Sequence, residues 1–540
     1  MGRSLYAALH RRYGRRLRGA DLKRRADFHR ERLRSVLPVG LLEASRASGA
    51  SPGTVAVVGG GLAGAAAAFT LNLLGFGVTV FDGGLGGRVS TQSTLVPNRL
   101  LETGAELIGI NHPLWLLFSD LFGLGMSVVT PDDDFAAQGL EMPLFLGGQS
   151  LNPFEQEALY NQMTEVYQGW CAQAGPAVPN PWAPWTAPNA ATLDSANLAA
   201  QMPSQTGLLF DAVNTTFVFN NLQPMSAQSW LANLAQFAAG ADFTGGDVTG
   251  FFDDTENFRC ASGNQSLLQA LLFDVDVNGS NVTDLDTTGG GVALTLAGGV
   301  SGGTFDYAVF AAPVSVFPVT TVDGGSPFPW NPVQAGYACK YLAPLDNRFW
   351  IGQGLAPSGM SDQAGMTWEA TDNQMALPGQ TGSQYCLTLF TGGPIAQQAV
   401  ALAQSGGTGW ADAYFEPLIA PMYPGIELAD NGGTFCCGAG GLAPYLMSGY
   451  SCPAPGQVTT IQASYATPYN GVLFLAGEHT SPAWFGFMEG ALESGLAAAV
   501  RLAVAAGVEI PSQAGGLEGA LVQLIEQDAA DILVGEATGQ

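Results

Sequence analysis

Basic residues are scarce in most of this sequence. The chain has 540 residues and a formal charge of −26, and 13 of its 19 lysine and arginine residues lie within residues 1–46. The remaining chain carries 6 basic residues against 41 acidic ones. Nucleic acids and anionic membranes bind clustered positive charge, so we expect neither as a partner. We interpret the acidic excess as a solubility or salt-adaptation feature, and attraction of cationic substrates is the alternative.

Metal ligands and long apolar runs are also few. Only His112 and His479 lie beyond the N-terminal segment, and the seven cysteines form no C-x-x-C pair. An ordinary zinc site is therefore not expected, and a chain of this size needs no disulfide framework. No run of 18 apolar residues is free of polar interruptions, and the N-terminus has no apolar signal segment. We therefore expect no metal and no membrane span, and a cytoplasmic location.

Glycine is abundant, and three glycines stand in an informative position. Residues 55–58 form the apolar run expected of a strand buried on both faces. Gly59, Gly61 and Gly64 follow it in the pattern G-x-G-x-x-G. In such a turn the first glycine allows the tight bend, the second lets the backbone approach a pyrophosphate, and the third lets helix pack on strand.

The residues after this turn complete a nucleotide-binding unit. Residues 65–74 contain no helix breaker, so we expect a helix whose N-terminus faces the phosphates. A second strand follows near residues 78–81 and ends at Asp82, where a carboxylate can accept hydrogen bonds from a ribose. This order of strand, turn, helix, strand and acid predicts a dinucleotide site.

Four further motifs resemble the flavin-containing amine oxidase family, which includes monoamine, polyamine and L-amino-acid oxidases. They are Gly86-Gly87-Arg88 with LETGAELIG after it, FDYAVFAAPVSV at 305–316, ACKYLAPLDNRFW around Lys340, and LAGEHTSPAWFGFMEGALESG near the C-terminus. The resemblance extends from about residue 53 to 503. GAELIGINHP, MTWEATDNQ and SGYSCPAPGQ look most like the bacterial L-amino-acid oxidase branch.

The resemblance implies an α/β fold with α+β insertions. A Rossmann-like FAD-binding domain would comprise residues 53–112, 255–318 and 455–505. A sheet-and-helix substrate-binding domain would comprise residues 113–254 and 319–454. Residues 1–50 are expected to form a basic arm, and residues 506–540 an acidic tail. The family is often dimeric, so a homodimer is possible.

The resemblance also implies a set of cofactor-binding residues. FAD is expected to be non-covalent, because Gly449 stands where some family members carry the cysteine that attaches the flavin. The expected FAD contacts are Gly59, Gly61, Leu62, Ala63, Gly64, Asp82, Gly87, Arg88, Gly104, Ala105, Glu106, Val282, Gly477, Glu478, Phe487 and Met488.

The expected catalytic residues are Lys340, Phe487, Tyr450 and Trp484. The family lysine that matches Lys340 holds a water beside flavin N5, and Phe487 and Tyr450 would face each other across the substrate. Leu107 stands where some L-amino-acid oxidases have a carboxylate-binding arginine. Arg259, Glu369 and Gly486 are weaker candidates for substrate contact.

These expectations lead to one function and three alternatives. An L-amino-acid oxidase would convert an amino acid, O2 and water to a 2-oxo acid, ammonia and hydrogen peroxide. The closest alternative is an amine or polyamine oxidase without carboxylate recognition. A desaturase or isomerase of lipophilic substrates, and a non-catalytic FAD-binding protein, are the others.

Overall fold

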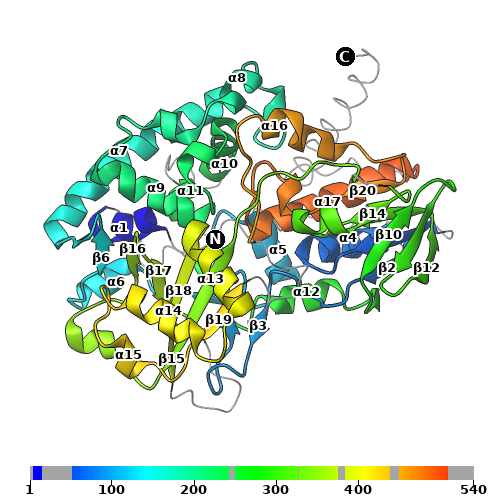
Figure 1. Ribbon diagram of the computed structural model, residues 1–540. Coiled ribbons are helices and arrows are strands. Elements are labelled where there is room, and N and C mark those ends of the chain that lie inside the picture. The colour runs from blue at the N-terminus through cyan, green and yellow to red at the C-terminus, as the bar shows by residue number, and fades with distance from the viewer. Residues whose placement is uncertain are drawn as a thin grey trace.

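The computed structural model describes residues 4–14, 51–242, 250–325, 328–374, 384–437 and 449–508. Figure 1 shows two groups of elements side by side. One group contains α4, α17 and the strands around β2, and the other contains α7, α9 and α10 together with the sheet of β15 to β19. Residues 509–540 of the predicted acidic tail, and residues 1–3 and 15–50 of the predicted arm, lie outside the described residues.

The first group is built on a five-stranded parallel sheet. Its order is β20-β13-β1-β2-β9, and every neighbouring pair is parallel. The strands are β1 (Thr54–Val58), β2 (Gly77–Phe81), β9 (Asp276–Asn278), β13 (Tyr307–Phe310) and β20 (Leu473–Leu475). Residues from three distant parts of the chain therefore share one sheet, and its central strand is the apolar run before the glycine turn.

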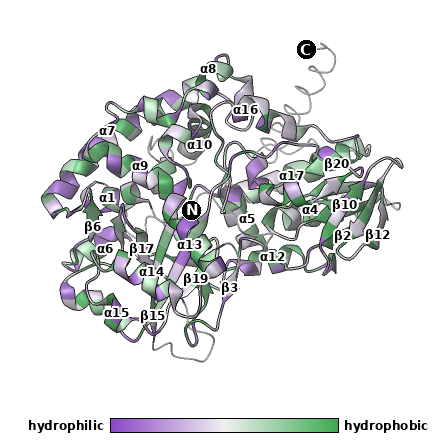
Figure 2. Cartoon of the chain, in the orientation of Figure 1, coloured by the Kyte–Doolittle hydropathy of each residue, from purple (hydrophilic) through white to green (hydrophobic). Residues whose placement is uncertain are grey.

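Two helices pack closely on this sheet and on each other. They are α4 (Leu62–Leu73) and α17 (Met488–Ala505). A Cβ at Gly64 would overlap the carbonyl oxygen of Gly59, so the third glycine of the motif does allow helix to pack on strand. Gly495 has the same role between the helices, because a Cβ there would overlap the carbonyl oxygen of Ala63. Figure 2 shows α4 as a mostly hydrophobic helix.

Shorter elements extend this group. Helix α5 (Pro113–Leu121) packs against α17, so the core continues past residue 112. A four-stranded sheet of order β12-β11-β10-β14 lies beside the parallel one. The remaining elements are α12 (Gln265–Leu271), β3 (Thr91–Gln92), β4 (Leu101–Glu102), β5 (Met126–Val128), β8 (Phe258–Cys260), β10 (Val282–Asp286), β11 (Val292–Leu296), β12 (Val300–Phe305) and β14 (Thr321–Val322).

The second group contains a seven-stranded mixed sheet of order β19-β15-β18-β17-β16-β6-β7. Its strands are β6 (Leu144–Leu146), β7 (Gln149–Ser150), β15 (Ala338–Leu345), β16 (Gly359–Ser361), β17 (Gly365–Glu369), β18 (Tyr385–Gly392) and β19 (Thr434–Cys437). Helices α13 (Gly393–Ser405), α14 (Trp410–Ile419) and α15 (Ile426–Ala429) accompany it. Lys340 lies on β15, as the resemblance to the family's lysine strand implies.

The helices of the second group bury an aromatic core. They are α6 (Asp132–Ala137), α7 (Pro153–Ala177), α8 (Ala190–Ser195), α9 (Leu208–Asn220), α10 (Trp230–Asp242), α11 (Gly250–Asp253) and α16 (Gln457–Thr460). Trp170 on α7 stacks on Phe237 of α10, with 6.1 Å between the ring centroids. The Pro- and Trp-rich segment between these helices contains only a short 3-10 turn, Pro184–Thr186. Proline cannot continue a regular helix, which accounts for the break.

Part of the predicted basic arm is a core element. Helix α1 (Leu5–Tyr13) begins at Ser4, whose side chain accepts a hydrogen bond from the backbone of Ala7. Its apolar residues are buried among α6, α7 and α11. Tyr6 packs edge-on against Tyr167 of α7, with ring centroids 4.8 Å apart. Residues 4–14 therefore contribute to the helical core.

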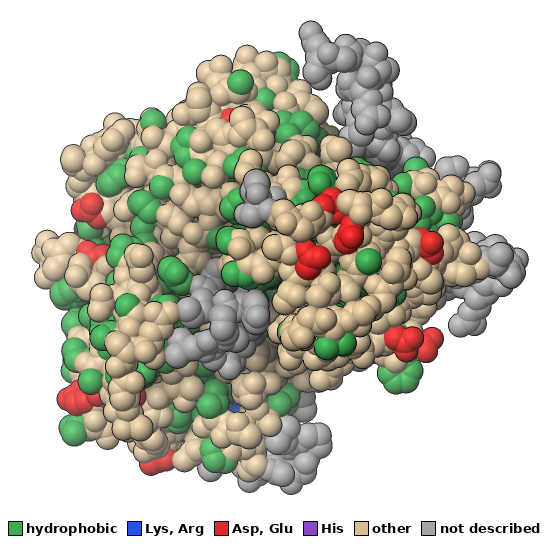
Figure 3. All heavy atoms as spheres, turned by 45° about the vertical axis from the view of Figure 1, so that its right-hand side comes forward, with side chains coloured by type: hydrophobic (Ala, Val, Ile, Leu, Met, Phe, Trp, Pro, Cys, Tyr) green, Lys and Arg blue, Asp and Glu red, His purple; other side chains and the backbone are tan. Residues whose placement is uncertain are grey.

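The surface reflects the charge distribution of the sequence. On the face that Figure 3 shows, acidic side chains are scattered between the described elements, and basic side chains are nearly absent. Within the described ranges, no helix is both long enough and apolar enough to cross a membrane.

Replacing Gly495 with alanine should destabilise the protein. The added Cβ would overlap backbone of α4, and overpacking of this kind typically costs about 1–3 kcal/mol. The matched control is Gly169→Ala, which lies on the exposed face of α7 with nothing within 4 Å of the added Cβ. The free energy of unfolding of the control should rise by roughly 0.5–1 kcal/mol, because glycine is unfavourable within a helix. Urea unfolding of both variants measures the two effects, and equal stability would contradict the close α4–α17 packing.

Candidate active site

One cavity of about 460 Å³ connects the two groups of elements. At one end it is lined by the glycine turn after β1 and by Val282 at the start of β10. At the other end it is lined by Lys340 of β15 and by Tyr450 and Phe487. Motifs that lie up to about 400 residues apart in the sequence therefore face one space.

The glycine turn presents unpaired backbone donors to this cavity. Helix α4 begins after Gly61, and no side chain caps its N-terminus. The backbone at Gly61 has an ordinary φ of −81°, and a Cβ there would meet no other part of the chain closer than 3.9 Å. Nothing within the chain itself therefore requires glycine at this position. A pyrophosphate that approaches the backbone does require it, and it would also satisfy the helix N-terminus.

Asp82 lies at the rim of the same end. Its carboxylate accepts hydrogen bonds from the backbone of Gly60 and of Gly84, and it lines the cavity. Asn281 lies beside it and accepts a hydrogen bond from Gly83 at 3.1 Å. The residues at this end thus combine a helix N-terminus with an acidic rim, which fits the phosphates and ribose of a dinucleotide.

Arg88 and Glu478 form an ion pair in the middle of the cavity wall. Arg88 Nη1 lies 2.7 Å from Glu478 Oε1 and also donates to the carbonyl oxygen of Gly449 at 3.0 Å. Glu478 further accepts hydrogen bonds from Ser451 Oγ at 2.6 Å and from the backbone of Gly486 at 2.7 Å. Burial alone would raise the pKa of Glu478, but the Arg88 charge and the hydrogen bonds from Ser451 and Arg88 together hold the pKa below its usual range.

Three strands of the mixed sheet place one row of side chains at the other end. Lys340 of β15 is paired with Phe390 of β18 on one side and with Cys436 of β19 on the other. All three line the cavity. No sequence motif marks Phe390 or Cys436, and only their register opposite Lys340 identifies them.

Aromatic rings form the opposite wall. Phe487 precedes α17 and packs edge-on against Trp484, with ring centroids 5.3 Å apart. Trp484 itself does not line the cavity but lies behind Phe487, against His112. Tyr450 is held by a hydrogen bond from its hydroxyl to the carbonyl oxygen of Asn220 at 2.7 Å. Trp484 was expected to touch the substrate, and the structure makes it a support for Phe487 instead.

A buried ionic cluster lies behind Lys340. Glu106 receives hydrogen bonds from Lys340 Nζ at 2.5 Å, from Arg259 Nε at 2.7 Å and from the Trp368 indole at 2.9 Å. Burial would raise the pKa of Glu106, but the charges of Lys340 and Arg259 together with the hydrogen bonds from Lys340 and Trp368 lower it. Glu106 was expected to contact the flavin, but it is not among the lining residues.

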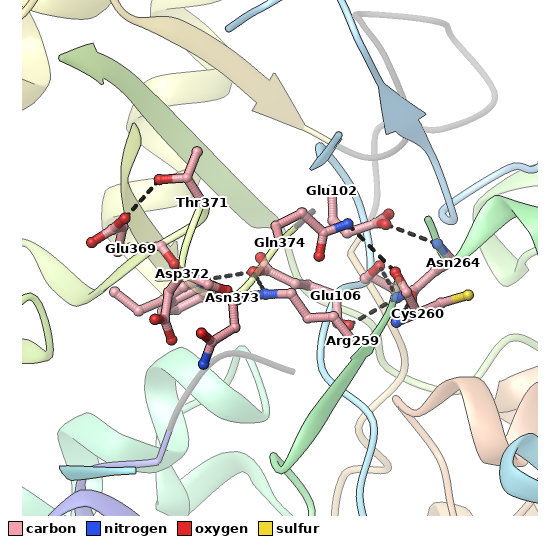
Figure 4. Close-up of polar contacts among 12 residues, drawn as sticks. Glu102, Glu106, Arg259, Cys260, Asn264, Glu369, Thr371, Asp372, Asn373 and Gln374 are labelled. Atoms are coloured by element: carbon pink, nitrogen blue, oxygen red, sulfur yellow. Dashed lines mark hydrogen bonds and ion pairs between the residues drawn. The ribbon is translucent and has the colours of Figure 1, made fainter. Parts of the chain in front are cut away.

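Two predicted substrate contacts also lie outside the cavity. Arg259 directs its guanidinium to Glu106 and to the carbonyl oxygens of Asp372 and Glu369, as Figure 4 shows for this cluster. The carboxylate of Glu369 forms a two-pronged ion pair with Arg348, at 2.7 and 2.8 Å. Neither residue lines the cavity, so the structure directs both side chains away from the space where a substrate would bind.

Most other predicted residues do line the cavity. They are Gly59, Gly61, Leu62, Ala63, Asp82, Gly87, Arg88, Gly104, Ala105, Val282, Lys340, Tyr450, Gly477, Glu478, Gly486, Phe487 and Met488. Leu107 is also a lining residue, so an apolar side chain occupies the place where some L-amino-acid oxidases have an arginine.

The comparisons with known proteins agree with this arrangement. A model of the family of flavin-containing amine oxidoreductases matches residues 62–503. The solved structure of wild-type putrescine oxidase bound to putrescine aligns with a TM-score of 0.65 at 18% identity, over 84% of this chain and 99% of that one. Cyclohexylamine oxidase from Brevibacterium oxydans gives the same TM-score, identity and coverage. A double mutant of putrescine oxidase aligns with a TM-score of 0.67 at 17% identity and the same coverage.

The chain belongs to the flavin-containing amine oxidoreductase family. The match covers most of the sequence, and it confirms the predicted α/β architecture and the family identified from the motifs. The family uses a flavin, and the described residues at the glycine turn fit FAD.

Glu102 should make folding depend on pH. Burial raises the pKa of this carboxyl from 4.5 to about 8, so between these values the folded state keeps a proton that the unfolded state releases. The stability contributed at low pH is therefore lost as pH rises, by up to about 1.4 kcal/mol per pH unit. Glu102→Gln resembles the protonated form and should lose less stability between pH 5.5 and pH 8 in urea unfolding. An equally steep loss would show that Glu102 is ionised in the folded protein.

Proposed function

We propose that this chain is an FAD-dependent amine oxidase that uses O2 and releases hydrogen peroxide, and that its substrate is an amine without a carboxylate. The observation that carries the proposal is that one cavity is lined both by the glycine turn and by Lys340 with its aromatic wall. When bound, the flavin would supply the hydride acceptor for oxidation of the substrate carbon.

The protein residues would bind and orient the two molecules. Gly61 and the N-terminus of α4 would hold the pyrophosphate, and Asp82 the ribose. Phe487 and Tyr450 would confine the amine, and their apolar surroundings favour its neutral form, which has the lone pair that oxidation needs. Helix α17 begins next to the cavity without a side-chain cap, and its positive end would stabilise negative charge on a reduced ring.

The charges of the cavity wall support an amine substrate over an amino acid. Among the described residues, the cations that line the cavity are Arg88 and Lys340. Arg88 is paired with Glu478, and Lys340 is paired with Glu106. A substrate carboxylate would therefore have to compete with a buried acid for either cation, and a buried charge without a partner of its own is costly.

An L-amino-acid oxidase is the second candidate. The motifs GAELIGINHP, MTWEATDNQ and SGYSCPAPGQ favour it, because they resemble that branch of the family. The structures that align with this chain are named for putrescine and cyclohexylamine, and at 18% identity they support only a common fold.

A matched substrate pair separates the two candidates. Phenethylamine and L-phenylalanine share a side chain and differ in the carboxylate. We expect anaerobic bleaching of the FAD-loaded protein by phenethylamine, cyclohexylamine or putrescine, and at least tenfold slower bleaching by L-phenylalanine and the other L-amino acids. The reverse order would establish the amino-acid oxidase. Bleaching by no amine and no amino acid would exclude both.

The flavin should be released by denaturation. Gly449 lines the cavity and has no nucleophile, so we expect all yellow colour in the supernatant after acid precipitation. Flavin absorbance that stays with the pellet after washing would contradict non-covalent binding. Peptide mapping would then test Cys436, a thiol that lines the cavity.

A further inference from the structure

Glu106 is a buried acid that does not line the cavity but contacts Lys340, which does. Its side chain is 2% exposed, and both of its oxygens are occupied. Oε2 receives the Lys340 ammonium, whereas Oε1 receives Arg259 and the Trp368 indole. These partners come from β15, β8 and β17, so one carboxylate connects three strands behind the active site.

Glu106 is the anion that Lys340 and Arg259 share. Lys340 makes its other hydrogen bond to the backbone carbonyl of Glu102 at 2.8 Å, and Arg259 makes its others to backbone carbonyls. Within the described residues, no second carboxylate forms an ion pair with either cation. Without Glu106, two buried cations would therefore remain with only neutral partners.

The remaining groups around Lys340 do not supply a negative charge near neutral pH. The Glu102 carboxyl faces Thr91 and Asn264, and burial raises its pKa to about 8. Burial also raises the pKa of the Cys436 thiol, to about 11, so it is neutral. The Trp368 ring lies 5.6 Å from Lys340 Nζ and contributes a cation–π contact without a full charge.

From these contacts we infer that Glu106 is a positioning residue for the proposed amine oxidation, because it keeps Lys340 as an ammonium in the cavity wall. An ammonium has three N–H donors, whereas a neutral amine has two. Glu106 and the Glu102 carbonyl take two of them. The third donor of the ammonium is then left for the cavity that Lys340 lines. The inference rests on the proposed function only where it assigns this third N–H donor a role in amine oxidation.

The chain itself provides a direct test, because it contains only two lysines, Lys23 and Lys340. Protein labelled with 13C and 15N at the lysine ε positions gives two side-chain NMR signals, which Lys340→Met assigns. Near pH 7.5 we expect Lys340 of the unmodified protein to be an ammonium. In Glu106→Gln we expect it to lose its proton in at least half of the molecules, because Arg259 then lies nearby without a counter-charge.

Glu102→Gln is the matched control. It removes a buried carboxyl from the same cluster but keeps the backbone carbonyl to which Lys340 donates. We expect the Lys340 ammonium to persist in this variant. A Lys340 signal that is the same in folded Glu106→Gln and in the unmodified protein would overturn the inference, as would loss of the ammonium in the control.

A second variant covers the case in which Glu106→Gln does not fold. Arg259→Gln leaves Glu106 to Lys340 alone, so the ammonium should be retained, and its loss would overturn the inference. These measurements need neither substrate nor flavin. If the Lys340 signal responds as expected but no amine reduces the loaded protein, the proposed function fails and the role of Glu106 stands.

Discussion

The burial of Glu106 between two cations is the interaction on which the active site depends. Lys340 and Arg259 reach this carboxylate from strands of different sheets, and Trp368 completes its hydrogen bonds. Removing one member of such a buried ion pair commonly costs about 3–5 kcal/mol, because the remaining charge loses its partner. The same contact that holds Lys340 at the cavity therefore also joins the two groups of elements.

This arrangement relates charge to substrate choice. The body of the chain keeps few basic residues, and those that line the cavity are each committed to an acid. The rest of the cavity wall is formed mainly by glycines, aromatic rings and aliphatic side chains, together with Asp82, Asn281, two threonines and two cysteines. Such a site suits a cofactor held by backbone donors and a neutral amine held by the shape of the pocket. Each described lining cation already has an ion-pair partner, which disfavours a substrate with a carboxylate.

The sequence predicted the features that local patterns encode. The glycine turn, α4 and β2 follow from residue patterns, the β15 strand of Lys340 follows from the family resemblance, and the structure has all of them. It did not predict where Arg259, Glu369 and Trp484 direct their side chains. Those depend on partners that are distant in the chain, such as Glu106 for Arg259. Phe390 and Cys436 were missed for the same reason, because only strand register brings them beside Lys340.

The central claim is that the glycine turn and Lys340 serve one bound flavin. The most direct test is a crystal structure of the FAD-loaded protein. We expect the pyrophosphate at Gly61 and the N-terminus of α4, and the flavin ring beside Lys340 and Phe487. A flavin ring bound away from Lys340, or a cavity that contains no FAD at saturating concentration, would contradict the claim.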